Sequence, residues 1–324
     1  MIESTDLNDL VQRHGSWLET GMDCGPVVSS RVRLARNLDA YHFPSWAPEN
    51  QRHAIWNQAF SLFSELNNTF MSWEMGSISK LDRDLLFERH LISQELVNKI
   101  NDSGVFVSQD EMMSVMINEE DHIRIQALKP GLNLQEAWQS ANLLDDQIEE
   151  IFSYAYDSKL GYLTSCPSNV GTGLRASVML HLPGLVLLEE MDPVINGISK
   201  IGLAVRGMWG EGTEAVGNMF QVSNQITLGK DESQIINHLE QIVLELVDHE
   251  VNARERLMNE KQLIIEDHIC RAFGLLSNSR LMTSNEALNL LSTLRLGLDL
   301  KLITGITRQE MDQLFISTQP AHLQ

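Results

Sequence analysis

The sequence predicts an α+β fold, in which an antiparallel sheet is flanked by helices and followed by an all-α helical bundle at the C-terminus. Four short segments have the composition of strands: residues 28–34, 114–117, 122–127 and 203–205. The helical stretches between them do not alternate regularly with these strands, which disfavours a doubly wound parallel sheet. After residue 253 only helical patterns follow. We therefore expect a mixed region first and a separate helical region after it.

The first strand is predicted by alternation in residues 28–34 (VSSRVRL). Apolar or small side chains alternate there with Ser29, Arg31 and Arg33, and a period of two is typical of a strand. Because alternate side chains of a strand project from the same face, Arg31 and Arg33 should lie side by side.

Residues 114–117 and 122–127 are expected to form a hairpin, joined by the link NEED at residues 118–121. In the second strand of this hairpin, Ile123 and Ile125 should face one way and Arg124 the other. The segment 203–205 is a further short strand that runs into Arg206.

Helices are predicted by apolar stripes with helical spacing. Pro48 should open one helix, residues 83–100 are a weaker candidate, and residues 134–155 are another. A long helix should begin at Asp231. The stripes consist of Ile55, Ala59, Leu62, Phe63 and Leu66 in the first helix and Ile235, Leu239, Ile242 and Leu246 in the last.

We place a domain boundary near residues 252–255, where the long helix should end. This divides the chain into an N-terminal lead (1–23), a mixed region (24–253) and a helical region (254–324). In the last region, Thr283 and Thr307 each precede a glutamate by three positions, as in a capping box. About 70 residues make a marginal core, so the bundle should pack against a second copy or against its own mixed region. Its core candidates are Leu288, Leu291, Leu294, Met311, Leu314 and Phe315.

The charge balance excludes some partners. Lys and Arg total 24 and Asp and Glu total 44, giving a net charge of −20. Such a field repels nucleic acid and anionic membranes and attracts basic partners, although it can also serve solubility alone. No apolar run is long enough for a membrane helix. The acidic N-terminus does not resemble a secretory or transit peptide, and three scattered cysteines do not form a disulfide framework. We therefore expect a cytoplasmic protein.

Arginines recur in segments rich in glycine or with strand character: Arg31, Arg33, Arg124, Arg175 and Arg206. A guanidinium fork can bind two phosphate oxygens at once, so five converging arginines could neutralise a triphosphate. The alternative is that each pairs with one of the many carboxylates. The sequence contains neither a Walker A motif nor a dinucleotide-binding glycine motif nor a protein-kinase signature set. Histidines and cysteines lack the spacing of metal ligands, so no metal-ligating residue is predicted.

Four segments together resemble the guanidino (phosphagen) kinase family and, within it, the bacterial protein-arginine kinases. They are SSRVRLARN (29–37), NEEDHIR (118–124), SCPSNVGTGLRAS (165–177) and RGMWGEGTEAVGN (206–218). The resemblance extends over roughly residues 24–251. It implies a guanidino kinase, glutamine synthetase-like catalytic domain at 24–253, a helical dimerisation domain at 254–324, and the use of ATP with Mg²⁺.

The resemblance also implies residue roles. The five arginines would clamp the ATP phosphates, and His90 would contact the nucleotide. Glu120 and Glu211 would hold the substrate guanidinium and take its proton, with the thiolate of Cys166 beside it. For Cys166 the alternative is a buried apolar cysteine. The implied nucleotide-binding segments comprise Ser29, Ser30, Arg31, Val32 and Arg33; Arg175, Ala176, Ser177, Val178 and Met179; and Arg206, Gly207, Met208, Trp209, Gly210 and Glu211.

Family members that phosphorylate small molecules carry a helical domain before the segment that here begins at Ser29. The resemblance therefore favours arginine-containing protein substrates, with a small-molecule guanidino (arginine) kinase or a non-catalytic binding protein as alternatives. It implies a homodimer, an activator protein, a stress-response repressor as substrate, and a Clp-type AAA+ protease that recognises phosphoarginine as a degradation tag. Such kinases usually continue beyond the segment QPAHLQ with a basic phosphoarginine-binding motif, whereas this sequence stops at Gln324.

Overall fold

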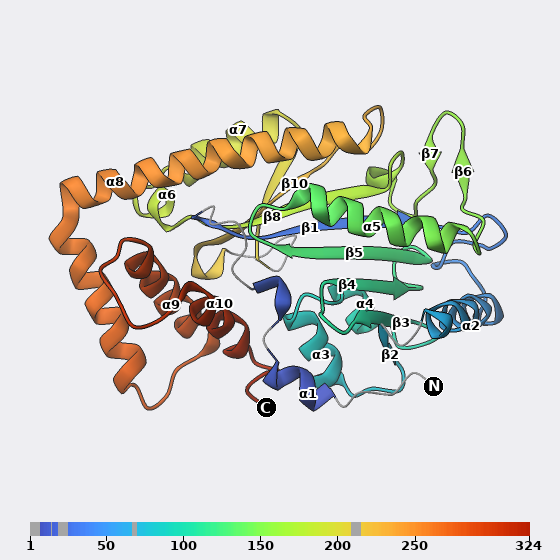
Figure 1. The fold of residues 1–324 in the computed structure, drawn as a ribbon, viewed down its shortest axis with the longest axis horizontal. Helices are drawn as coiled ribbons and strands as arrows, with labels where there is room; N and C mark the ends of the chain where they lie inside the picture. The colour runs from blue at the N-terminus through green and yellow to red at the C-terminus, as the bar shows by residue number, and fades with distance from the viewer. Residues whose placement is uncertain (1–6, 14, 19–24, 67–69, 209–214) are drawn as a thin grey trace.

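The computed structural model describes residues 7–13, 15–18, 25–66, 70–208 and 215–324. Eight strands of these residues form one sheet in which every neighbouring pair is antiparallel, in the order β2-β3-β4-β5-β1-β8-β10-β9 (Figure 1). This confirms the predicted fold class. The strands are β1 (Val27–Arg36), β2 (Phe70–Glu74), β3 (Gly104–Ser108), β4 (Met113–Ile117), β5 (Ile123–Pro130), β8 (Leu174–His181), β9 (Leu203–Gly207) and β10 (Met219–Asn224). Two short strands, β6 (Tyr156–Asp157) and β7 (Gly161–Tyr162), form a separate hairpin.

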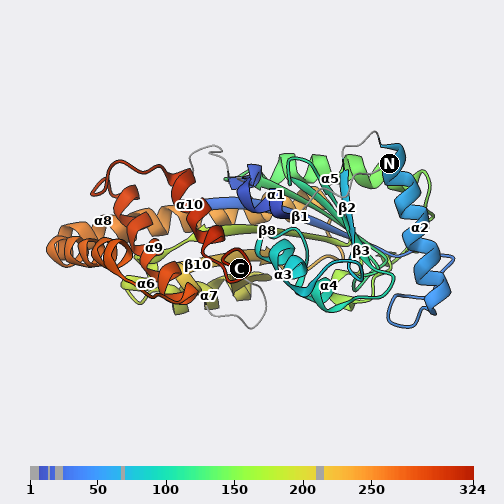
Figure 2. The same cartoon turned by 90° about the horizontal axis from the view of Figure 1, so that it is seen from below.

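Helices flank the sheet and continue into the C-terminal region, which lies at one end of the molecule in both views (Figures 1 and 2). They are α1 (Leu7–Gln12), α2 (Glu49–Glu65), α3 (Lys80–Glu88), α4 (Gln94–Asn98), α5 (Leu134–Glu149), α6 (Pro183–Leu187), α7 (Met191–Lys200), α8 (Glu232–Asn278), α9 (Ser284–Asp299) and α10 (Arg308–Ser317). Three 3₁₀ turns occur at Ser16–Leu18, Pro167–Asn169 and Val216–Asn218.

The main core lies on one face of the sheet. Val32, Ala176 and Val222, from three adjacent strands, are completely buried there. Helices α5 and α8 pack on this face, because α5 contacts β1 and β5 and α8 contacts β8 and β10. The predicted alternation is therefore confirmed for residues 29–34: the even positions face the core and the odd positions project from the other face. It fails at Val28, because a β-bulge between Val27 and Ser29 turns Val27 into the core instead, and Val28 packs against the cluster that holds Leu128 and Met219.

The predicted hairpin is also present, since β4 and β5 pair antiparallel across residues 118–122. Two helix predictions need correction. Residues 83–100 form two helices because His90 adopts a left-handed conformation (φ 60°) and Ser93 then caps α4. The helix predicted to reach residue 155 ends at Glu149, because the chain turns back and Ala155 donates a backbone hydrogen bond to Asn37 at the end of β1.

The long helix was expected to end near residue 252, and this expectation was wrong. Helix α8 begins after Asp231, which forms the capping box with Gln234, and continues to Asn278. No proline or glycine occurs in residues 232–273, so nothing in the backbone chemistry stops it. Lys261 has non-helical angles (φ −136°, ψ 27°), and α8 changes direction within its length (Figure 1). The domain limits at 253/254 remain a prediction, since that position lies inside a continuous helix.

The C-terminal helices share a core with the sheet region of their own chain. Leu288, Leu291 and Leu294 are buried in a cluster that also holds Leu128 of β5 and Met219 of β10. If the bundle packed against a second copy through these three leucines, they would be exposed in the single chain. They are buried instead, so these leucines form no exposed apolar face. Of the other core candidates, Met311 and Phe315 are buried, whereas Leu314 is 37% exposed. Both predicted N-caps form. Thr307 makes the full capping box with Glu310, whereas at the start of α9 only the Thr283 hydroxyl accepts the backbone N–H of Glu286.

Polar contacts fix the bundle in place. His181 of β8 and Asn218 both bond to the hydroxyl of Ser292 in α9, at 2.9 and 2.8 Å. The segment after α10 is held by Glu88 at the end of α3. This carboxylate accepts hydrogen bonds from the backbone amides of Ala321 and His322 and from the His322 ring. In the described part of the chain, no helix is both long and apolar enough to cross a bilayer.

We predict that the free energy of unfolding decreases as the pH falls below about 6.5. Burial, helped by Arg31, lowers the pKa of His90 from 6.5 to about 3, and burial lowers that of His122 to about 4. Burial and nearby arginines lower the pKa of His181 well below its usual range. Below pH 6.5 these histidines bind protons in the unfolded chain but stay neutral in the folded chain. Their contribution to the free energy of unfolding is therefore fully present above pH 6.5 and decreases as the pH falls toward the folded pKa values.

Urea unfolding measured in steps from about pH 7.5 to pH 5 checks this slope. Replacement of one buried ring, His181→Gln, should make the curve flatter, while replacement of the exposed His53 should not. An unfolding free energy that is equal at both ends of the range would contradict the assignment.

Candidate active site

The five arginines line a single cleft. Its volume is about 1270 Å³, and His90, Glu120 and Cys166 also form part of its wall. Residues that are directly paired across antiparallel strands project from the same face. Arg33 of β1 pairs with Arg175 of β8, and Ala35 pairs with Arg124 of β5. The cleft therefore lies on the face of the sheet that is opposite the apolar core.

The remaining two arginines reach this face by the same rule. Arg31 pairs with Ser177 of β8, and Arg206 of β9 pairs with Gln221 of β10. Arg31 donates to Gln221 Oε1 at 2.6 Å and to Ser177 Oγ at 3.4 Å. Gln221 thus links the central strand β1 to the edge strand β9. The predicted convergence of the arginines is what the strand register produces.

The cleft concentrates positive charge in a protein with a large negative net charge. Burial, followed by repulsion from Arg175 and Arg124, lowers the pKa of Arg31 to about 10. Burial, followed by repulsion from Arg31 and then from Arg124 and Arg175, lowers the pKa of Arg33, whose guanidinium makes no hydrogen bond to any residue that the structure describes. Guanidinium groups that repel one another gain free energy from a shared anion. This end of the cleft therefore suits a polyphosphate.

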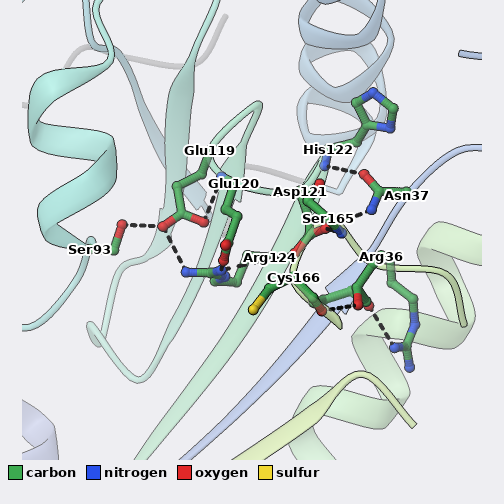
Figure 3. Close-up of polar contacts among 12 residues, drawn as sticks. Arg36, Asn37, Ser93, Glu119, Glu120, Asp121, His122, Arg124, Ser165 and Cys166 are labelled. Carbon is green, nitrogen blue, oxygen red and sulfur yellow. Dashed lines mark hydrogen bonds and ion pairs between the residues drawn. The ribbon is translucent and has the colours of Figure 1, made fainter. Parts of the chain in front are cut away.

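At the other end, Arg124 is bound by carboxylates (Figure 3). Its Nη1 donates to Glu119 Oε1 at 2.7 Å and its Nη2 to Glu120 Oε2 at 2.8 Å. Burial alone would lower the pKa of Arg124, but the charges of Glu119, Asp121 and Glu120 outweigh it, and the pKa is raised. For this arginine, pairing with carboxylates is therefore what the structure shows.

Glu120 is the carboxylate of this group that remains accessible, with a side chain 40% exposed. Burial raises its pKa, although Arg124 opposes the shift. Its Oε1 makes no hydrogen bond to the described residues, while Glu119 is completely buried and bonded to Ser93 and to the Glu120 amide. Glu120 can therefore accept a proton from a group in the cleft, and Glu119 holds the loop behind it.

Cys166 is partly exposed on the cleft wall, so the reading as a buried apolar cysteine is wrong. Its Sγ lies 3.0 Å from Ser168 Oγ, and Figure 3 shows the sulfur on the side of Glu120 and Arg124. The loop that carries it reaches β8 through Gly173, whose φ is +65°. A Cβ at Gly173 would lie 2.6 Å from the Ala35 carbonyl oxygen, so glycine allows this approach.

His90 lies where the cleft meets a smaller cavity, which Arg31 also borders. Its ring makes an edge contact with Trp17, with 5.4 Å between centroids. Burial and Arg31 lower its pKa to about 3, so the ring is neutral near pH 7. Six of the predicted nucleotide-binding residues border the smaller cavity: Ser29, Arg31, His90, Ser177, Met179 and Met208.

Some predicted residues lie elsewhere. The side chains of Val32, Ala176 and Val178 are buried in the core on the opposite face, so only their backbone could contact a nucleotide. Ser30 is buried with its hydroxyl bonded to the Gly131 carbonyl. Gly207 is the buried last residue of β9. Trp209, Gly210 and Glu211 lie outside the described residues, so the predicted role of Glu211 has no geometry here.

Several cleft residues carry no local signal in the sequence. Gln221 and Gln126 are ordinary polar positions of strands, and their place on the arginine face follows only from the register. Residues 319–321 border the cleft although they follow the last helix. The sequence leaves Glu119 and Asp121 open as loop charges or as partners behind the neighbouring Glu120, and the structure shows both buried, with Glu119 bonded to Arg124. No group of three potential metal ligands occurs among the described residues.

Comparison with known families agrees with this geometry. The family "ATP:guanido phosphotransferase, C-terminal catalytic domain" matches residues 53–253, and "Protein-arginine kinase McsB C-terminal domain" matches residues 262–324. Two similar curated proteins are both called protein-arginine kinase. The one from Desulforamulus reducens is 48% identical over 96% of this chain and 88% of that protein. The one from Pelotomaculum thermopropionicum is 45% identical over 96% and 89%.

Solved structures share the fold. The duplicated taurocyamine kinase from Schistosoma mansoni, with bound transition state analog components, superposes with a TM-score of 0.65 and 25% identity over 82% of this chain and 39% of that chain. A lombricine kinase superposes with a TM-score of 0.63 and 24% identity over 76% and 71%. Together with the match of both family regions and the identity to full-length relatives, these similarities show that the chain belongs to the ATP:guanido phosphotransferase family, in its protein-arginine kinase branch.

Proposed function

We propose that this protein transfers the γ-phosphoryl group of ATP to arginine side chains of other proteins. The observation that carries the proposal is a cleft with arginines at one end and an accessible carboxylate, Glu120, at the other. The relatives called protein-arginine kinase support the choice of acceptor.

The arginine end would hold the nucleotide. Phosphoryl transfer needs positioning and neutralisation of charge on the phosphate oxygens. Arg31, Arg33, Arg175 and Arg206 supply these charges from four positions on three strands, which fixes their geometry through the sheet. Mg²⁺, when bound with the nucleotide, would draw charge from the phosphates, and Glu120 and Glu95 are carboxylates of the cleft wall that could take part in holding it.

The carboxylate end would hold the acceptor. A guanidinium nitrogen attacks the γ-phosphorus, a P–N bond forms, the bond from that phosphorus to the β,γ-bridging oxygen breaks, and ADP leaves. The nitrogen loses one proton, which Glu120 accepts. Glu120 Oε2 already accepts from the Arg124 guanidinium at 2.8 Å, while its Oε1 makes no hydrogen bond to the described residues, which supports Oε1 as the atom that binds the acceptor guanidinium. Glu211 is proposed as the second carboxylate from sequence resemblance, and Cys166 lies on the same wall.

A small-molecule guanidino kinase is the second candidate, since the solved neighbours include taurocyamine and lombricine kinases. Incubation with ATP and Mg²⁺ and either an arginine-rich protein or free arginine distinguishes the two. We expect acid-labile phosphate on the protein, read by intact mass. Phosphorylation of free arginine alone would contradict the proposed substrate class.

We also propose cytoplasmic action as a homodimer, with an activator protein and a Clp-type AAA+ protease as partners. Exposed apolar side chains support the dimer. Leu263 and Phe273 in the second half of α8 are 79% and 58% exposed, and Leu281 after it is 93% exposed. Apolar side chains of this size on one segment are typical of an association surface.

One prediction concerns the arginines that would clamp the ATP phosphates. Arg206→Lys should keep the fold and lower the rate of transfer by at least about tenfold, because a lysine cannot bind two phosphate oxygens at once. Arg124→Lys should also lower the rate, because a lysine cannot bond to Glu119 and Glu120 with the same fork. Steady-state kinetics measures both. The control is Arg256→Lys, which alters an exposed pair with Glu190. A near-normal rate for Arg206→Lys would refute the clamp.

The second prediction concerns the base. Glu120→Gln keeps the size of the side chain and removes its charge and basicity, so the rate should fall by at least ~10²-fold. ATP binding, measured by calorimetry, should persist because the arginines are unchanged. Glu136→Gln, at an exposed position of α5 that does not line the cleft, is the matched control. If Glu120→Gln transfers phosphate at the normal rate, Glu120 is not the base and the proposed pair of Glu120 and Glu211 has only a structural role.

The third prediction concerns association. Light scattering at micromolar concentration should show a dimer, and Leu263→Glu should shift it toward monomer by placing a charge in the apolar surface. Leu143→Glu, at a 65% exposed position of α5, should leave the dimer intact. A chain that is monomeric without any substitution would overturn this part of the proposal.

A further inference from the structure

Asn37 connects three segments of the site. It follows directly after β1 and is only 1% exposed. Its amide nitrogen donates to Asp121 Oδ1 at 2.6 Å and to the Leu163 carbonyl at 3.1 Å. Its amide oxygen accepts the backbone N–H of His122 at 3.0 Å. One buried side chain therefore ties the end of a central strand to the NEED link and to the segment before Cys166 (Figure 3).

Asp121 completes the connection. It is completely buried, and the same Oδ1 that binds Asn37 also accepts the backbone N–H of Ser165 at 2.7 Å. Asp121 adjoins Glu120, and Ser165 adjoins Cys166. Two hydrogen bonds thus meet at Asp121 Oδ1, one residue away from the Glu120 carboxylate and, through Ser165, one residue away from the Cys166 thiol.

The second oxygen of Asp121 shows that stability alone does not account for this arrangement. Its Oδ2 is buried, makes no hydrogen bond to the described residues, and lies 4.0 Å from Arg124 Nη2. An unsatisfied buried carboxylate oxygen lowers stability, and such groups in native structures call for a role. The negative charge of Asp121 also raises the pKa of Arg124, the residue that binds Glu119 and Glu120.

Only an asparagine fits the position of residue 37. An amide donates and accepts at once, which the Asp121 carboxylate and the His122 N–H both require. An aspartate would bring two carboxylates within hydrogen-bond distance of each other, and like charges so close repel strongly. An alanine would leave a buried N–H and one lobe of a buried carboxylate without a partner.

We propose that Asn37 and Asp121 are positioning residues of the transfer reaction, which fix the Glu120 loop relative to the Cys166 loop so that both face one acceptor guanidinium. This proposal rests on the proposed function. Correct placement of reacting groups accounts for a large part of a catalysed rate, and a displacement of about 1 Å can cost ~10²-fold. Asn37 follows the strand that carries Arg31 and Arg33, but its side chain bonds only to Asp121, Leu163 and His122 among the described residues, so nucleotide binding should be unaffected.

The test compares two disrupting single variants with one conservative variant. Asn37→Asp puts a carboxylate against Asp121 and the Leu163 carbonyl, and Asp121→Ala removes the oxygen at which the bonds from Asn37 and Ser165 meet. We expect kcat of each of these two single variants to fall by about 10²-fold while KM for ATP stays within about twofold. Asp121→Asn is the conservative variant, because its amide oxygen can still accept both bonds, and its kcat should exceed that of Asp121→Ala by at least about tenfold.

Alkylation of Cys166 gives a second readout that needs no turnover. Iodoacetamide labelling, followed by peptide mass spectrometry with the exposed Cys270 as internal reference, reports on the loop directly. We expect Cys166 to react at least about threefold faster in the two disrupting variants, Asn37→Asp and Asp121→Ala, because freed loops expose the thiol, and to react at close to the original rate in Asp121→Asn. If a single variant fails to fold, Asn37→Ser, which keeps one hydrogen bond, provides the same comparison.

Glu250→Gln is the matched control, because Glu250 is another completely buried carboxylate, bonded to Gly184 and Arg254 far from the cleft. It should lower thermal stability without changing the reactivity of Cys166 relative to Cys270. The proposal is overturned if the two disrupting variants change kcat no more than this control, if KM for ATP rises in parallel, or if Cys166 labelling is unchanged. Absence of phosphate transfer by the unsubstituted chain would count against the proposed function, while the labelling result would still decide the positioning role.

Discussion

Repulsion among half-buried arginines is the constraint on which the rest of this structure depends. Arg33 and Arg175 are paired directly across neighbouring strands, and Arg31 lies two positions along the same strand. Guanidinium groups so arranged lower one another's pKa and destabilise the empty cleft. The sheet can hold them because the opposite face of the same strands is a continuous apolar core against α5 and α8. The free energy gained by burying the apolar face of the sheet offsets the repulsion among the arginines on its other face.

The counter-charges are unevenly placed, and this gives the cleft its polarity. Arg124 is bonded to both Glu119 and Glu120, whereas Arg33 makes no hydrogen bond within the described part of the chain. One end of the cleft therefore attracts an anion and the other a cation. The two reactants of guanidino phosphorylation, a polyphosphate and a guanidinium, carry these two charges. Their reacting atoms should meet where the two ends join, between the arginines of β1 and β8 and the carboxylate of Glu120.

The features that could be predicted from the sequence are those that follow from the spacing of side chains along one strand or one helix. Alternation in residues 28–34 is sufficient to place Arg31 and Arg33 on one face, and the NEED link between two strands is sufficient to place Glu120 in a loop. The length of α8 could also have been predicted, because no proline or glycine interrupts residues 232–273. The boundary predicted near residues 252–255 depends on the long helix ending there, but a helix ends where its backbone is capped or broken, and α8 continues to Asn278.

Contacts between distant segments could not be predicted in this way, because a periodic pattern shows which face a side chain occupies and not what it meets there. Asn37 meets Asp121 across 84 positions, and Glu88 meets His322 across 234. The second contact has a structural consequence for the site. Glu88 holds the segment after α10, and His90, two residues further on, lies on the cleft wall together with residues 319–321 of that segment. The C-terminal region is therefore part of the cleft itself, and its position and that of the nucleotide end of the site depend on the same turn after α3.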